Sequence, residues 1–128
     1  MSTGPRLIQQ DMVPVWFPTF PPDLEPFLAA SNPLYAGFYQ DQPACIAGFV
    51  PQQRSGEALL WGWTTPLIDA HPLVHARWAR RLIDRVHSVY PTIVGYCAQS
   101  KLRWIRLLGG RISPASNGYL YFTIEVLQ

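Results

Sequence analysis

The chain has 128 residues, about the length of one domain, and 48% of them are hydrophobic. Charged residues make up only 14%, against a usual share of about 25%, and aromatic residues make up 13%. This composition excludes a disordered polar chain, and there is no run of about 18 apolar residues to span a membrane. The net charge of +2 is too small to indicate nucleic-acid binding. We therefore expect one domain over residues 1–128, with neither a membrane nor a nucleic acid as its partner.

The two cysteines, Cys45 and Cys97, match no metal-binding spacing. Residues 1–10 lack the basic and apolar regions of a secretory signal. We therefore expect two reduced thiols in a cytoplasmic protein. We also expect the cysteines to lie on strands separated by one other strand, about 10 Å apart and beyond disulfide reach.

The N-terminal half is predicted to alternate short elements with proline-rich connections. Residues 14–22 hold four prolines among aromatic residues and predict an extended loop. The Asn32-Pro33 pair is expected to end the helix that precedes it. The predicted elements are a strand at 6–10, a helix at 23–30, strands at 34–40 and 44–50 joined by a turn at 41–43, and a central apolar strand at 57–65.

The C-terminal half is predicted to contain the two main helices. Residues 71–90 form the long helix, which Pro91 ends, and residues 92–98 form a buried strand. Residues 100–108 form a shorter helix with Ser100 as N-cap and Gly109 as its C′ glycine. The closing strands are placed at 110–112 and 119–126, around a turn at 116–118.

The long helix divides into two faces at about 100° per residue. The apolar face is expected to pack on the sheet, and it comprises Trp78, Ala79, Leu82, Val86 and Val89. His71 and His75 lie at the N-terminal end of this face, so their imidazoles are expected to point toward a cleft or the sheet edge. The opposite face holds Arg77, Arg80, Arg81, Asp84, Arg85 and Ser88. Such a face is usually only solvated. Arginine, however, forms bidentate pairs with anions, so Arg77, Arg81 and Arg85, here called the arginine stripe, are a candidate protein-partner surface. The Val15–Phe20 loop is a second one, because exposed apolar patches mark interfaces.

The order of elements, with a long helix after the central strand and a short one after the next strand, resembles the GCN5-related N-acetyltransferase (GNAT) fold. The segment Gly95–Ile112 (GYCAQSKLRWIRLLGGRI) carries this resemblance most specifically. The run Leu60–Gly109 is more narrowly similar to the GNAT-like proteins of short-tailed phages, one group of which are internal virion proteins. The resemblance implies an α+β, three-layer fold with a mixed, mostly antiparallel sheet of six to seven strands.

The resemblance also implies a place for acetyl-CoA. In GNAT enzymes the central strand splays from its neighbour, and the pantetheine arm inserts there. By this similarity the cofactor-contacting residues are Trp61, Gly62, Trp63 and Thr64, with Cys97 on the facing strand. Glycine inside a strand is typical of a bulge or of close backbone approach. A simple kink between two bulky tryptophans explains Gly62 equally well.

Two departures from the family pattern weaken the expectation of a working cofactor site. The loop that holds the pyrophosphate of CoA is normally glycine-rich, whereas residues 64–73 (TTPLIDAHPL) contain no glycine and include Asp69 and Pro72. The tyrosine that protonates the thiolate in many GNAT enzymes corresponds here to Ile105. Tyr96 is a possible substitute, although a hydrogen-bonded structural tyrosine is the commoner role. Acetyl-CoA is therefore expected to bind weakly or not at all.

Candidate general bases are Glu57 and the histidines His71 and His75, since imidazole titrates near neutrality. The alternatives are an exposed residue beside a turn for Glu57 and a packed histidine for His75. Two histidines four residues apart have metal-ligand spacing, but no third ligand is near in sequence, so no metal is expected. The preferred hypothesis is a diverged GNAT-like protein of phage type, with a binding or virion-associated role and weak or absent acyltransfer. The alternative is an active acetyl-CoA-dependent N-acetyltransferase of a small amine or protein.

Overall fold

A computed structural model describes residues 3–114 and 119–126 of the chain. The strands are β1 (Gly4–Leu7), β2 (Leu34–Tyr39), β3 (Gln42–Pro51), β4 (Glu57–Thr64), β5 (Thr92–Ala98), β6 (Arg111–Pro114) and β7 (Tyr119–Glu125). The α-helices are α1 (Val13–Trp16), α2 (Glu25–Ala30), α3 (Pro66–Asp69), α4 (Pro72–Val86) and α5 (Leu102–Leu107). Short 3₁₀ turns precede α1, α2 and α5: η1 (Gln10–Met12), η2 (Pro22–Leu24) and η3 (Gln99–Lys101).

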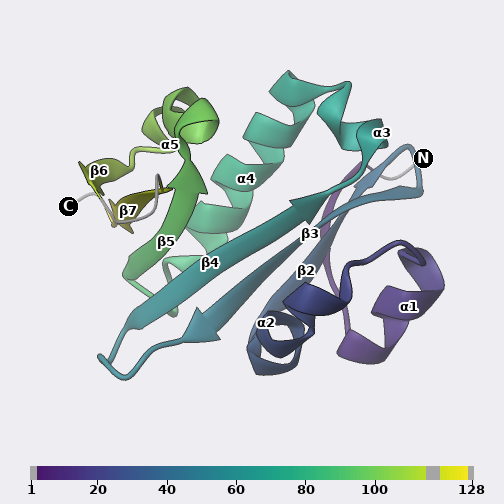
Figure 1. Ribbon diagram of the computed structural model, residues 1–128, viewed down its shortest axis with the longest axis horizontal. Helices are drawn as coiled ribbons and strands as arrows, with labels where there is room; N and C mark the ends of the chain where they lie inside the picture. Colours follow the sequence, from purple (N-terminus) through teal and green to yellow (C-terminus); the bar gives the residue numbers. More distant parts are fainter. Residues whose placement is uncertain (1–2, 115–118, 127–128) are drawn as a thin grey trace.

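The strands form one mixed sheet of seven strands in the order β1-β2-β3-β4-β5-β7-β6. Every neighbouring pair is antiparallel except β4 and β5, which run parallel because α3 and α4 cross over between them. Figure 1 shows α4 and α5 on one side of the molecule and α1 and α2 on the other. The expected α+β architecture, the strand count and the mostly antiparallel pairing are confirmed.

Three apolar clusters pack on the faces of the sheet, and the smallest joins Ile68 and Trp78 to β3. The core under α4 contains Leu82, Ile83 and Val86 from the helix, packed on sheet residues such as Phe49 and Ile93. The core under α1 and α2 joins helix residues to alternate sheet residues; it contains Val13, Phe17, Leu28, Leu34, Ala36, Phe38, Ile46 and Trp61. Since successive side chains of a strand point to opposite faces, one strand supplies both cores.

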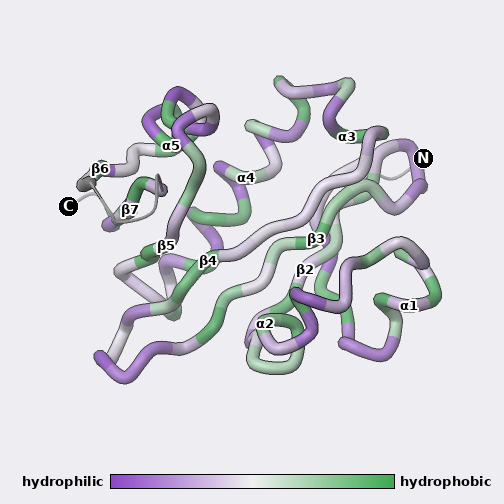
Figure 2. The backbone as a smooth tube through the Cα atoms, viewed as in Figure 1, coloured by the Kyte–Doolittle hydropathy of each residue, from purple (hydrophilic) through white to green (hydrophobic). Residues whose placement is uncertain are grey.

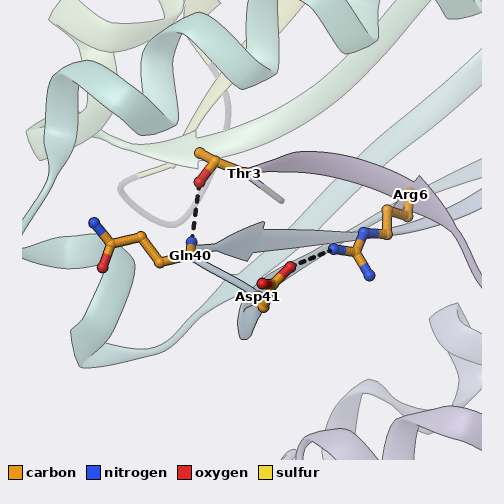
Figure 3. Close-up of polar contacts among 4 residues, drawn as sticks. All are labelled: Thr3, Arg6, Gln40 and Asp41. Atoms are coloured by element: carbon orange, nitrogen blue, oxygen red, sulfur yellow. Dashed lines mark hydrogen bonds and ion pairs between the residues drawn. The ribbon is translucent and has the colours of Figure 1, made fainter. Parts of the chain in front are cut away.

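The N-terminal strand is attached to the β2–β3 turn by side-chain contacts (Figure 3). The backbone amide of Gln40 donates to the Thr3 hydroxyl at 3.0 Å, and the Arg6 guanidinium lies 3.3 Å from the Asp41 carboxylate. Gln40 and Asp41 have φ of 50° and 66°, so they form a two-residue hairpin with both residues left-handed. The turn therefore lies at residues 40–41, whereas the sequence placed it at 41–43, and β3 begins at Gln42.

The main helices are shorter than predicted. The long helix was expected over residues 71–90 but ends at Val86, and residues 88–90 turn back toward β5 through bonds from the amides of Val89 and Tyr90 to the Val86 carbonyl. Val89 is consequently 64% exposed, and its expected place on the buried face is wrong. The second helix was expected over 100–108 with Ser100 as N-cap. It begins as a 3₁₀ turn instead, and Lys101 stands at the cap of α5 with no side-chain cap bond. Gly109 follows with φ +83°, as a C′ glycine should.

The expected aromatic loop at residues 14–22, including the Val15–Phe20 contact patch, is partly helical and mostly covered. Helix α1 occupies residues 13–16, and Phe17 is 2% exposed in the core. Trp16 and Phe20 are half-buried against Phe38 and the β4 tryptophans, because aromatic rings bury large areas when a sheet face is near. Val15 remains exposed. The prediction of an exposed aromatic surface is therefore wrong.

Smaller differences concern the ends of strands. The first strand lies at residues 4–7 and not at 6–10, β6 begins at Arg111, and helix α3 was not predicted. The predicted turn at 116–118 lies outside the described residues. Figure 2 shows hydrophilic residues at the tip of the β3–β4 hairpin and apolar stretches within the strands. Cys45 and Cys97 are free thiols on β3 and β5 with β4 between them, as predicted. Among the described residues, no helix is both long and apolar enough to cross a membrane.

Candidate functional site

Strands β4 and β5 separate halfway along their length. They pair at three positions, Glu57 with Thr92, Ala58 with Ile93 and Leu59 with Val94, and form no later pair in the described chain. In Figure 1 the two arrows start together and diverge toward their carboxyl ends. The opening between them is here called the β4–β5 gap. Such a gap leaves the second half of β4 without a strand partner on one side.

The backbone of β4 presents polar groups to this gap. The Glu57 carbonyl accepts from Gln52 and the Thr65 amide donates to the Ala44 carbonyl, so the odd-numbered residues of β4 bond to β3. In an antiparallel ladder the alternate residues then direct their amides and carbonyls to the other side. For Gly62 and Thr64 that side is the β4–β5 gap. An extended ligand with amide groups could bond there as an added strand.

Gly62 lies at the gap with open space beside it. A Cβ built on Gly62 would meet only the Ile46 carbonyl oxygen within 4 Å, at 3.4 Å, which is ordinary contact. The flanking tryptophans do not fill the gap with their side chains. Trp61 packs in the core under α2, where its indole N–H donates to the Ser31 hydroxyl at 2.6 Å, and Trp63 lies against Phe17 and Phe20. Free space therefore lies beside the glycine, and its role in binding a cofactor stays a prediction.

A cavity of about 380 Å³ lies at the gap. Its walls come from helices α3, α4 and α5 and from the sheet, mainly strands β2 to β5, and they are mostly apolar with a few polar groups, as is common for small-molecule sites. The residues that matter for chemistry are Gly62, Thr64, Asp69, His75, Tyr96, Cys97, Lys101, Trp104 and Ile105. The cofactor residues expected from the sequence, Trp61, Gly62, Trp63, Thr64 and Cys97, all line this cavity.

His75 is the titratable base of the cavity. Its ring lies 5.1 Å from the Trp104 ring, between centroids. Burial lowers the pKa of His75, and the nearby Lys101 ammonium lowers it further, while Asp69 acts weakly in the opposite direction. The imidazole is therefore neutral at pH 7 and able to accept a proton.

Cys97 and Tyr96 are neighbours on β5 but face opposite sides of the sheet. Cys97 packs with the α4 core, and burial raises the pKa of its thiol, so it is protonated and a poor nucleophile. Tyr96 is 60% exposed on the other face, where its ring meets that of Tyr121 edge-on at 5.3 Å. Ile105, at the position of the usual family acid, is buried and offers no proton.

Glu57 lies away from the cavity. It stands at the start of β4, five residues before Gly62, which is about 17 Å along a strand. His71 is also set apart, because its ring stacks on Tyr39 at 4.2 Å. In residues 3–114 and 119–126, no cluster of three His, Cys, Asp or Glu side chains is placed to hold a metal ion. Of the bases considered from the sequence, His75 is thus the one at the cavity.

The segment between β4 and α4 does not form an open anion-binding loop. It folds into helix α3, whose Ile68 is fully buried. The amides of residues 68–71 bond to carbonyls within the segment, and Pro66 and Pro72 have no amide hydrogen. Asp69 adds a carboxylate at the cavity wall. Few backbone amides remain here for a phosphate.

The sequence did not single out Lys101 or Trp104. Lys101 is the one lysine of the chain and follows the end of β5, the strand that diverges. The position of Lys101 shortly after this strand was the one sequence feature that could have indicated it. Trp104 lies on the short helix α5, and its ring forms the cavity wall beside His75.

The arginine stripe lies away from the sheet, as its helical spacing predicted. All three side chains are exposed on α4, and within the described part of the chain none has an ion-pair partner. Arg80, on the same helix, donates to the Leu107 carbonyl at 3.0 Å and so connects α4 to α5. Whether the stripe binds a partner stays a prediction.

Comparisons with known proteins identify the fold. No protein-family model and no curated protein sequence matches the chain. Among solved structures it is similar to the ribosomal-protein-S18-alanine N-acetyltransferase from Escherichia coli, at 15% identity and a TM-score of 0.73 over 99% of this chain and 96% of the other. It is similar to a Bacillus subtilis acetyltransferase in complex with CoA, at 11% identity and a TM-score of 0.72 over 98% and 100% of the two chains. A third is a GNAT family acetyltransferase from Elizabethkingia anophelis with acetyl-CoA bound, at 13% identity and a TM-score of 0.65 over 98% and 97%. None of these three is described as a phage protein. The likeness spans nearly the whole of each chain, and it shows that this protein has the GNAT acetyltransferase fold.

Proposed function

We propose that the protein is an N-acyltransferase that takes its acyl group from a pantetheine thioester such as acetyl-CoA. The observation that carries this proposal is the β4–β5 gap with its unpaired strand edge at Gly62 and Thr64 and its cavity of about 380 Å³. The structures that share the fold include proteins with CoA or acetyl-CoA bound.

The two ends of CoA fit this site differently. The extended thioester arm, with its two amides, matches the polar strand edge and the apolar walls. The diphosphate finds no glycine-rich loop, because α3 has used the amides of residues 68–71 and Asp69 repels an anion there. We therefore expect the nucleotide half of CoA to contribute little to binding.

Acyl transfer to an amine needs one proton relay. The amine nitrogen forms a bond to the thioester carbon, the carbon–sulfur bond breaks, and one proton must pass from nitrogen to the departing sulfur. Neutral His75 can accept that proton and return it to the thiolate. Since the Cys97 thiol is protonated, direct transfer is favoured over an acyl-cysteine intermediate. Tyr96 and Glu57 are less suited to this relay, because Tyr96 is on the open face and Glu57 is far along the strand.

A truncated donor tests the proposal sharply. We expect acyl transfer from both acetyl-CoA and S-acetyl-pantetheine, with kcat/KM values that differ by less than about tenfold, because the missing nucleotide made few contacts. The His75→Gln variant should reduce both rates at least 100-fold, the range of general acid–base catalysis. His71→Gln serves as the matched control, because His71 stacks on Tyr39 and is not among the residues that line the cavity. No transfer from either donor to any amine would refute the proposal.

A second candidate is a GNAT-fold binding protein with little catalysis, including a virion-associated role. The occupied α3 segment and the apolar Ile105 favour it. Under this hypothesis the arginine stripe binds an anionic partner. Calorimetric titration with acetyl-CoA tests this second candidate: a micromolar dissociation constant, about −8 kcal/mol, would contradict it and favour the transferase.

A further inference from the structure

The layer between helix α4 and the sheet is not completely filled. Strand alternation and the helical period place Ala47 on β3, Leu60 on β4 and Ala79 on α4 inside this layer, where they pack against the α4 core. All three residues are nevertheless only half-buried, whereas Phe49 and Leu82 in the same layer are buried. Protein interiors normally contain few voids larger than a water molecule. A hollow that solvent can reach therefore remains under α4.

This hollow is continuous with the β4–β5 gap. Ala47 is the direct partner of Gly62 in the β3–β4 ladder, and Tyr35 is the partner of Ala47 on β2. Neither Gly62 nor Ala47 has a side chain beyond Cβ, so the sheet surface is low at both positions. These residues and Ala79 line the same cavity. The part of the cavity that crosses β4 toward Tyr35 is here called the α4 branch. A donor arm that lies beside β4 as an added strand does not enter it.

Large apolar side chains bound the α4 branch. The Trp78 ring packs on Gly37, where a Cβ would lie only 3.0 Å from two of its ring atoms. Phe49 is fully buried, and its ring meets that of Tyr35 edge-on at 6.4 Å between centroids. Leu82 lines the branch from α4, one turn beyond Trp78. The surroundings are therefore suited to an apolar occupant and offer little to a charged one.

The length of the α4 branch limits what can fill it. Neighbouring strands lie about 4.8 Å apart, so Tyr35 stands about 10 Å from Gly62, across two spacings. Subtracting one van der Waals contact of about 3.7 Å leaves about 6 Å. An extended alkyl chain, with bonds of about 1.5 Å, advances about 1.3 Å per carbon. The branch therefore has room for about five carbons beyond a carbonyl at the gap, of which an acetyl group supplies only the first.

We infer that the protein transfers a saturated acyl chain of about six carbons, with its thioester in the β4–β5 gap and its tail in the α4 branch. This inference rests on the proposed acyl transfer and names the acyl group of its donor. Ala47 below the tail and Ala79 above it admit the chain, because larger side chains at these positions would occupy its space. The occupant is the acyl tail because the branch opens from the gap, where the thioester carbon lies.

Donors of different chain length test this inference in rate measurements. With a panel of simple amines as acceptors, we expect kcat/KM for S-hexanoyl-pantetheine to exceed that for S-acetyl-pantetheine at least tenfold, because each buried methylene group strengthens binding about fourfold. S-dodecanoyl-pantetheine, which is longer than the branch, should be a poorer donor than the hexanoyl compound. Ala79→Leu should lower the ratio of hexanoyl to acetyl kcat/KM at least tenfold. Ala29→Leu, the same exchange at an exposed position of α2, is the matched control and should keep the wild-type ratio.

A binding measurement without an acceptor separates failure of this inference from failure of the proposed function. Calorimetric titration should give a dissociation constant for S-hexanoyl-pantetheine at least tenfold below that for S-acetyl-pantetheine, and Ala79→Leu should remove this difference. Thermal unfolding checks that the variant is folded, and Ala47→Leu replaces it if it is not. Equal dissociation constants for the two donors in the wild type would overturn the inference, as would rates that depend on the length of the acceptor and not of the acyl chain. Tighter hexanoyl binding without transfer to any amine would overturn the proposed function and leave the α4 branch as an acyl-chain site.

Discussion

Replacing Gly62 with alanine tests whether the β4–β5 gap is a binding site, because the change should reduce the space in the gap without destabilising the fold. The side chains of Ala58 and Leu60 belong to the α4 core, so strand alternation directs a Cβ at Gly62 into the cavity on that face. That Cβ would meet only the Ile46 carbonyl, at 3.4 Å, and the glycine does not need a left-handed backbone. The methyl group therefore enters empty space that a donor arm needs.

The substitution should raise stability slightly and lower activity. Removing the conformational freedom of glycine from an unfolded chain stabilises by about 0.5 kcal/mol, which for a domain of this size raises Tm by about 2 °C. The same methyl group should lower kcat/KM for S-acetyl-pantetheine at least tenfold, about 1.4 kcal/mol of lost transition-state binding. Gly62→Val should lower it further.

The assay pairs thermal unfolding with thiol release, and Gly95→Ala is the comparison. A Cβ at Gly95 would lie 2.4 Å from the Phe122 ring and 2.9 Å from the Leu60 carbonyl, so stability and activity should fall together in that variant. In Gly62→Ala activity alone should fall. Unchanged kcat/KM in Gly62→Ala, or a loss of stability like that of Gly95→Ala, would refute the argument that the gap is a binding site.

The remaining predictions concern titration and the charged surface. Because burial lowers the pKa of His75, the unfolded chain binds a proton more readily than the native one. The free energy of unfolding should therefore fall as the pH drops below about 6.5. Urea titrations at pH 7.5 and 5.0 should show that this free energy falls less in His75→Gln than in the wild type. Burial raises the pKa of Cys45 to about 12, so a thiol reagent at pH 8 should modify Cys97 much faster, and equal rates would contradict the buried position. Changing the whole arginine stripe to glutamine should alter the free energy of unfolding by no more than about 0.5 kcal/mol. The variant should lose association with an anionic partner in a pull-down. If the wild type and the variant retain identical partners at low and at high salt, the stripe is ordinary surface.

The sequence by itself determined the order of the main elements and the faces of the long helix. Apolar runs such as residues 92–98 predicted a buried strand with the bounds that β5 has, and the 3.6-residue period predicted Trp78, Leu82 and Val86 on the core side. These features depend on neighbours in the chain, which is why the sequence carries them. The glycine between two tryptophans and the missing glycines before α4 were also visible there.

Only the tertiary structure decided which of the candidate residues meet. Whether Gly62 opens a gap depends on β5 diverging after Val94, and the choice between Glu57 and His75 depends on which end of β4 the cavity occupies. Val89 and Phe17 departed from expectation because a helix end and a covering sheet face are set by long-range packing. The ring pairs Phe20–Trp63 and Tyr96–Tyr121 each join residues that are far apart in sequence, and no local period could bring them together.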